Sequence, residues 1–252
     1  MGKFNKSAAS LLAAALCSSM AFADDVIVSG VLEAEFVMAE DYAEEKVTDI
    51  TAATVEIGID AAVSDRVDAH VLMLYEEDEA ESAIVDEASI TLNVNDSFSA
   101  TVGKIYVPFG AYVSNMVSDP LTLELGETNE SVIQLDFSLA NTYAGVYLFN
   151  GDSTRITDTD DNEISYGLNI GFNHNDIFNA SLGYLSNLAD TDALQELDFD
   201  GAVERYPGLI KDDVAGMSFS AEIIISHLKI IAEHVQALDD FVAADFDGLI
   251  TT

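Results

Sequence analysis

The stretch ISYGLNIGFN, from Ile164 to Asn173, alternates apolar residues with polar or small ones at every step. Successive side chains of a β-strand point to opposite faces, so this pattern predicts a strand with one apolar and one polar face. The alternation recurs at 53–61, 67–75 and 215–223. Extended along the chain, the pattern predicts about eleven strands, at 26–38, 51–63, 66–76, 83–94, 97–107, 131–139, 142–150, 163–173, 177–187, 214–225 and 228–237. The last of these segments also fits a short helix.

The connections between the predicted strands are short and long in turn. Tight turns alternate with loops at 39–50, 77–82, 108–130, 151–162 and 188–213. Outer-membrane barrels have this order, with short periplasmic turns and longer external loops. The sequence therefore predicts an all-β fold, a transmembrane antiparallel up-and-down β-barrel of the porin type, rather than a soluble sandwich.

Aromatic residues gather near the two ends of the predicted strands. Belts of Tyr and Phe at both membrane interfaces are a feature of such barrels, and this chain has no Trp to share that role. The belt predicted at the long-loop ends consists of Tyr75, Tyr106, Phe149, Tyr166 and Tyr184. The belt predicted at the short-turn ends consists of Phe98, Tyr143, Phe172 and Phe178.

The two ends of the sequence lead to predictions about processing and completeness. A basic start, an apolar run from Ala8 to Cys17 and the small residues of Ala21-Phe22-Ala23 predict a cleaved signal peptide at 1–23. Residues 24–252 would then form the barrel, in the outer membrane of a Gram-negative bacterium. Because an odd number of strands leaves the last one at an external loop, we expect the barrel to be incomplete at the C-terminus. The total strand number and the oligomeric state stay open, with a homotrimer as one option because trimers are common among porins.

The chain is strongly acidic, with 46 Asp and Glu against 9 Lys and Arg and a formal net charge of −37. This charge excludes nucleic acid as a natural partner and is compatible with a path that attracts cations. Nothing in the sequence resembles a nucleophile motif, and no spacing of His, Asp or Glu indicates a zinc site. We therefore expect neither an enzyme nor a bound cofactor or metal ion. The run DTDDNE at Asp158–Glu163 has calcium-like spacing but lacks the glycine and distal glutamate of an EF-hand loop, which favours a solvated charge run.

The connection after the fifth predicted strand is long, apolar and punctuated by proline. It contains GKIYVPFG (Gly103–Gly110), NMVSDPLTLELGET (Asn115–Thr128) and Glu130. In these residues the chain resembles the siderophore porin family of the legiobactin-receptor (LbtU) type. The resemblance implies an outer-membrane barrel, with lipid and a small solute as partners, that takes up ferric siderophore without an energy-coupled plug domain. Two alternatives remain open: a general cation-preferring diffusion porin, and a non-transporting surface binding barrel.

A loop as long and apolar as 108–130 is expected to bury itself, and the lumen of a barrel offers a place for it. We expect 108–130 to fold inward as the third external loop and narrow the pore; the alternative is that it packs over the rim. The groups expected at this constriction, for pore lining or substrate binding, are Lys104, Tyr106, Asp119, Glu124, Glu127 and Glu130. Strand alternation predicts lumen-facing polar side chains at Glu56, Asp60, Asp68, Ser165, Asn169, Ser218 and Glu222.

Overall fold

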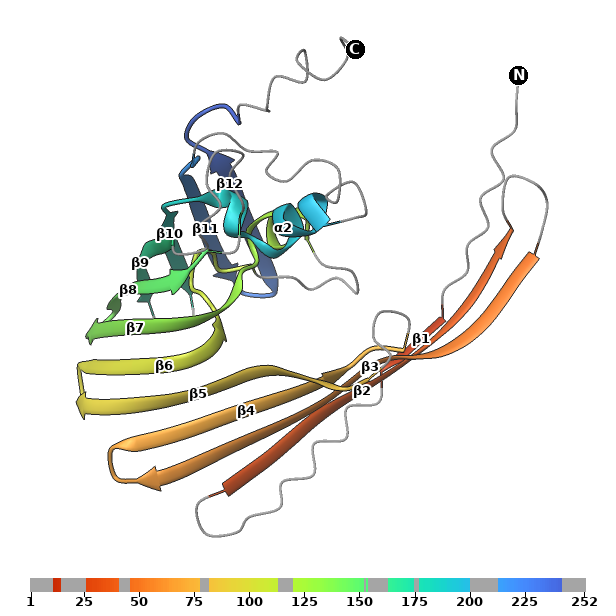
Figure 1. Ribbon diagram of the computed structural model, residues 1–252, viewed down its shortest axis with the longest axis horizontal. Coiled ribbons are helices and arrows are strands. Elements are labelled where there is room, and N and C mark those ends of the chain that lie inside the picture. The colour runs from red at the N-terminus through yellow and green to blue at the C-terminus, as the bar shows by residue number, and fades with distance from the viewer. Residues whose placement is uncertain are drawn as a thin grey trace, which may run out of the picture. The chain divides into compact units, whose positions relative to one another are not determined.

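The computed structural model describes residues 11–14, 26–40, 46–77, 82–112, 120–151, 153, 163–174, 177–199 and 213–241. Its strands form one antiparallel sheet in which each strand lies beside its neighbours along the chain (Figure 1). From Val26 onward the strands are β2 Val26–Glu40, β3 Lys46–Ser64, β4 Val67–Tyr75, β5 Ile84–Asn95, β6 Phe98–Tyr106, β7 Asn129–Leu139, β8 Thr142–Asn150, β9 Ile164–His174, β10 Phe178–Leu185, β11 Gly216–Ile225 and β12 Leu228–Ala237.

The prediction of an all-β chain with an up-and-down antiparallel sheet is confirmed. Most strands from β2 to β12 lie close to their expected bounds, and the last of them is a strand rather than a short helix. The exception is β3, which begins at Lys46 rather than at 51, and because β2 continues to Glu40 the expected loop 39–50 is too long at both ends. A further strand, β1 (Leu11–Ala14), pairs with β2 and lies inside the segment predicted to be a signal peptide. Among the described residues, no helix is both long enough and apolar enough to cross a membrane.

The chain divides into two compact units, residues 1–90 and 91–252. The first unit contains β1 to β4 and the beginning of β5. In it, β3 pairs with β2 on one side and with β4 on the other, and the register shifts between Ala62 and Ser64. One face of this unit carries exposed apolar side chains, among them Ile57 and Met73, which are directly paired across the two strands.

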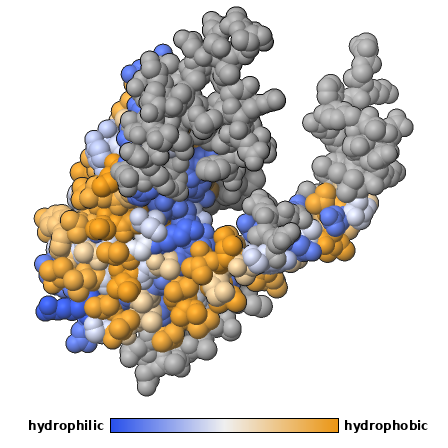
Figure 2. Space-filling model, viewed as in Figure 1, coloured by the Kyte–Doolittle hydropathy of each residue, from blue (hydrophilic) through white to orange (hydrophobic). Residues whose placement is uncertain are grey.

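The sheet of the second unit exposes its apolar face. On β9, Tyr166, Leu168 and Ile170 are 44–49% exposed, whereas Ser165 and Gly167 are buried. Strands β7 and β11 largely repeat this inversion, and Figure 2 shows hydrophobic side chains gathered over the strands. On β8, Val146 and Leu148 are exposed as well, but the buried residues are Gly145 and the aromatic Tyr147 and Phe149. We call the opposite face, which carries Ser165 and Gly167, the enclosed face. A sheet in water would bury the apolar face and expose the polar one, so the pattern is the reverse of that in a soluble protein.

Two segments outside the strands cover the enclosed face of the second unit near the long-loop ends. The first follows β6 and contains α1 (Leu121–Gly126). The second follows β10 and contains η1 (Leu188–Asp190) and α2 (Asp192–Phe199). With side chains of the sheet, these segments form an apolar core of Val107, Phe109, Val132, Tyr147, Phe149, Leu185 and Leu188.

The alternation pattern predicts neither helical segment, because both occur in stretches assigned to loops. The loop expected at 108–130 ends earlier than predicted, because Asn129 and Glu130 already belong to β7. Pro120 occupies the N-cap position of α1, where a residue without a backbone N–H is tolerated because the first helical N–H groups have no partner within the helix.

Two aromatic rings on β8 lie over glycines of β9. Tyr147 pairs with Gly167 and Tyr143 with Gly171, and a Cβ at either glycine would overlap the tyrosine ring. Glycine therefore permits this close approach. Tyr143 and the buried Phe149 lie on the same face of β8 as Tyr147, so the prediction that they belong to outward aromatic belts is wrong. Side-chain parity, rather than position near a strand end, decides which face a ring takes.

Candidate functional site

The segment after β6 is attached to β10 and β11 through Phe109. The Phe109 side chain is 1% exposed, and its carbonyl oxygen accepts a hydrogen bond from Ser218 Oγ on β11. On β10, a Cβ at Gly183 would overlap the same carbonyl group. The backbone N–H of Val107 donates to the carbonyl oxygen of Thr128 at 2.9 Å, which closes the base of the segment. The segment therefore extends from β6 over the enclosed face to strands that come much later in the chain.

Helix α1 of this segment lies against β12. Thr122 Oγ1 donates to Glu233 Oε2 at 2.6 Å. The Tyr112 ring lies so close to Gly126 that a Cβ there would overlap the phenol. Burial, followed by the negative charges of Glu233 and Glu127, raises the pKa of Tyr112, so its hydroxyl stays protonated at neutral pH.

The segment after β10 is held by a buried carboxylate. Asp190 is fully buried; its Oδ2 accepts a hydrogen bond from Ser165 Oγ, and its Oδ1 accepts one from the backbone N–H of Ser153 at 3.2 Å. A Cβ at Gly151 would lie 2.8 Å from both carboxylate oxygens, so glycine permits this packing. Burial raises the pKa of Asp190 and the nearby Asp213 carboxylate adds to the shift, while the serine hydrogen bonds oppose it.

The two covering segments also bind each other. The backbone N–H of Asp192 donates to the carbonyl oxygen of Glu127 at 2.9 Å. The Asp192 carboxylate accepts from the backbone N–H of Asn129 at 3.1 and 3.2 Å. Gln195 Nε2 donates to Glu130 Oε1 at 3.4 Å. The first bond joins the two segments directly, and the others tie the second segment to the start of β7, so that one layer lies over part of the enclosed face.

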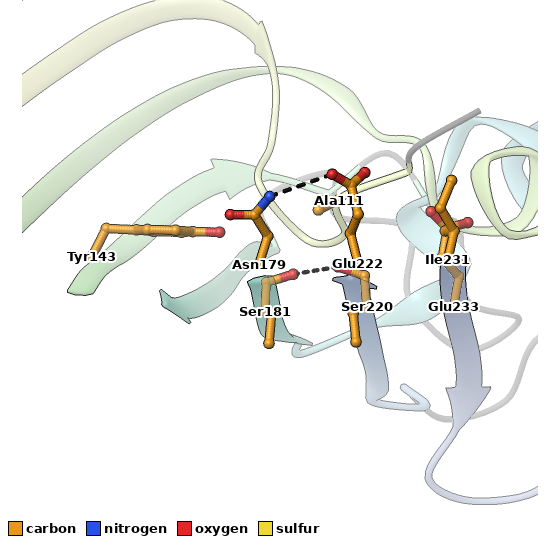
Figure 3. Close-up of a pocket in the computed structure, with 10 residues that line it drawn as sticks. Ala111, Tyr143, Asn179, Ser181, Ser220, Glu222, Ile231 and Glu233 are labelled. Carbon is orange, nitrogen blue, oxygen red and sulfur yellow. Dashed lines mark hydrogen bonds between the residues drawn. The ribbon is translucent and has the colours of Figure 1, made fainter. Parts of the chain in front are cut away.

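A polar pocket of about 50 Å³ lies on the enclosed face, among the halves of β10, β11 and β12 that are nearer the short turns (Figure 3). The hydroxyl oxygens of Ser181 and Ser220 are 2.8 Å apart, and Asn179 Nδ2 donates to Glu222 Oε1 at 3.5 Å. Lys229 Nζ lies 2.7 Å from the other oxygen of Glu222. The polar residues that line the pocket are Tyr143, Asn179, Ser181, Ser220, Glu222 and Glu233.

The structure does not bring together the residues expected at a constriction. Lys104 and Tyr106 lie on the opposite face of β6 from Ile105, which packs against the apolar core, so strand alternation turns both away from the enclosed face. Glu124 is exposed on α1. Asp119 lies outside the described residues.

The other predicted residues of the second unit lie on or beside the enclosed face. Glu130 receives the hydrogen bond from Gln195, and Glu127 is the C-cap of α1. Asn169 is paired with Gly145, where a Cβ would overlap the Asn169 amide oxygen. Glu222 lines the polar pocket.

Three predicted lumen residues belong to the first unit. Glu56, Asp60 and Asp68 share the face opposite to Ile57, as the alternation of β3 and β4 predicts. Asp60 Oδ1 lies 2.7 Å from Nδ1 of His70, its direct partner on β4.

Sequence reasoning missed most of the pocket and the buried Asp190. Asn179 and Ser181 follow the period-two pattern of FNASLGYL in β10, and that signal was sufficient to find them. Asp190 carries no such signal, because it lies in a helical turn between strands. The described residues contain no group of three or more His, Cys, Asp or Glu that could hold a metal ion, and most of Asp158–Glu163 lies outside them.

No protein-family model matches this chain. The chain is similar to a UPF0422 protein of Coxiella burnetii, at 25% identity over 229 residues that cover 86% of this chain and 48% of that protein. It is also 29% identical over 162 residues to a UPF0422 protein of Legionella pneumophila, with 58% of this chain and 30% of that protein covered. The chain thus spans about half the length, or less, of these curated relatives.

Proposed function

We propose that this chain forms part of an outer-membrane β-barrel channel for a small solute, and that the solute is a ferric siderophore. The observation that carries the proposal is the inverted sheet of the second unit, which exposes apolar side chains and, outside the apolar core under the covering segments, encloses small or polar ones. Lipid stabilises such an apolar surface, whereas water makes its exposure costly. A barrel wall with an aqueous interior needs these two faces.

The layer formed by the two covering segments supports a narrowed path. It occupies part of the enclosed face near the long-loop ends and is joined to β11 through Ser218 and to β12 through Glu233. Segments folded over the polar face of a barrel wall reduce the open cross-section, and their side chains then determine what passes. The polar pocket borders this layer, because Ala111 of the segment after β6 lines it, and it provides hydrogen-bonding groups.

The choice of ferric siderophore depends on the resemblance of Gly103–Gly110 and Asn115–Thr128 to the siderophore porin family. A specific observation favours each alternative. The carboxylates of Glu222 and Glu233 in the pocket favour a cation-preferring diffusion porin. The apolar core that fills part of the enclosed face favours a non-transporting surface barrel.

Planar-bilayer recording with the full-length protein distinguishes these functions. We expect discrete conductance steps that saturating ferric siderophore blocks. Replacement of 111–126 by a short Gly-Ser linker should increase the conductance, because it removes α1 from the enclosed face. The matched control is Leu121→Ser, which changes an exposed side chain of α1 and should conduct like the wild type.

Each other result has a definite meaning. Folded protein that never conducts would contradict the channel and leave the surface barrel. Conductance without siderophore block would leave the cation-preferring porin. Unchanged conductance after the linker replacement would show that the segment does not narrow the path.

A further inference from the structure

The polar pocket has more hydrogen-bond acceptors than donors. Glu222, 8% exposed, and Glu233 bring carboxylates to it. In the part of the chain that the structure describes, the buried Asn179 Oδ1 has no hydrogen-bond partner. The orientation of this amide follows from Glu222, because an ionised carboxylate only accepts and Asn179 must turn its NH₂ group toward it. Figure 3 shows the amide oxygen of Asn179 on the side of Tyr143.

An ammonium group of the chain itself already binds at the edge of this pocket. Lys229 Nζ lies 2.7 Å from Glu222 Oε2, on a Glu222 side chain that is 11% exposed. Across the strand pair, Glu233 stands directly opposite Ser220 and accepts a hydrogen bond from Thr122. A carboxylate can accept several hydrogen bonds at once, so both carboxylates are suited to a ligand that donates.

We infer that this pocket is a binding subsite for a primary alkylammonium group. Its volume of about 50 Å³ suits a terminal –NH₃⁺ with the adjoining methylene. The three N–H donors of such a group match Asn179 Oδ1, the Glu233 carboxylate and the hydroxyl pair of Ser181 and Ser220. A role of this subsite in solute passage rests on the proposed channel function. Binding of the ammonium group does not depend on whether the protein conducts.

Isothermal titration of the full-length protein in detergent, with n-butylammonium chloride as the probe, tests this inference. Tetramethylammonium chloride carries the same charge without N–H donors and should bind much more weakly. Glu233→Gln should weaken n-butylammonium binding about tenfold, the effect of removing one charge-assisted hydrogen bond. Asn179→Leu should also weaken it, because it removes the unpartnered acceptor. Lys229→Met should strengthen binding several-fold, because it removes a positive charge beside the subsite and leaves the Glu222 carboxylate to attract the cation.

The matched control is Asp240→Asn, which removes one negative charge from an exposed position after β12 and should bind like the wild type. Circular dichroism establishes that each variant keeps its strands. Equal binding of the two cations, or unchanged binding in both Glu233→Gln and Asn179→Leu, would overturn the subsite. Bilayer recording separates this result from the channel proposal. Binding without conductance leaves the subsite and removes the channel, whereas conductance without binding does the opposite.

Discussion

Asp190 shows how the surroundings of one residue determine its ionisation. Burial holds the pKa of its carboxyl group above the ordinary value of 3.8, in spite of the hydrogen bonds from Ser153 and Ser165. Between pH 3.8 and the raised pKa, the folded protein therefore binds a proton that the unfolded chain has released. Folding stability from this group is present below the unfolded pKa and is lost as the pH rises through that window, at about 1.4 kcal/mol per pH unit.

The substitution Asp190→Asn tests this linkage. The variant has no carboxyl group at this position, so its free energy of unfolding should lack the decline that the wild type shows from about pH 4 upward. The Ser165 hydroxyl can reverse its role and accept a hydrogen bond from the new amide, which limits the structural cost. The measurement is urea unfolding in detergent, followed by circular dichroism at a series of pH values. Asp240→Asn, at an exposed position, should keep the wild-type slope; a decline that persists in Asp190→Asn would assign it to another group.

At the scale of elements, the segment after β6 depends on a missing side chain in β10. The carbonyl group of Phe109 lies where the Cβ of any other residue at position 183 would stand. Gly183→Ala should therefore displace the segment and lower the free energy of unfolding by about 1–3 kcal/mol, the usual cost of overpacking. We expect larger single-channel conductance as well, because the displaced segment leaves the enclosed face.

Denaturant unfolding and planar-bilayer recording measure these two effects. The control is Leu182→Ala, which shortens an exposed, outward side chain next to Gly183 and should leave the conductance unchanged. Wild-type stability together with wild-type conductance in Gly183→Ala would show that the Phe109 carbonyl does not hold the segment in place.

The strands could be predicted from the sequence because each has a local period of two, whereas the covering segments could not. The placement of Asn169 and Glu222 on the enclosed face follows from alternation within β9 and β11. The position of Phe109 depends on Ser218 and Gly183, which are distant in sequence, and no local pattern encodes that meeting. Tyr143 and Phe149 are predicted on the wrong face for a different reason. Their position near a strand end does not say which face of the sheet a side chain takes, whereas the alternation of residues along β8 does.

At the scale of the whole molecule, the proposed channel would account for both the sheet and the charge of the chain. Enclosing polar side chains and exposing apolar ones is unfavourable in water and favourable for a wall between lipid and an aqueous path. The formal net charge of −37 is also unusual, and part of it lies on the polar strand faces, at Glu56, Asp60 and Glu222. Negative charge that lines or flanks a path raises the local concentration of cations and lowers that of anions.

If the chain forms the proposed channel, that channel should prefer cations to anions, and the preference should weaken as salt increases. Screening explains the second part, because the Debye length falls from about 10 Å at 0.1 M salt to about 3 Å at 1 M. The measurement is the reversal potential of the full-length protein in planar bilayers under a fixed KCl ratio, at low and then at high mean concentration. The combined variant Glu222→Gln with Glu233→Gln should reduce the shift of the reversal potential at low salt, whereas Asp65→Asn, in an exposed turn, should not. Anion preference, or a cation preference that salt and the double variant leave unchanged, would show that these carboxylates do not control what passes.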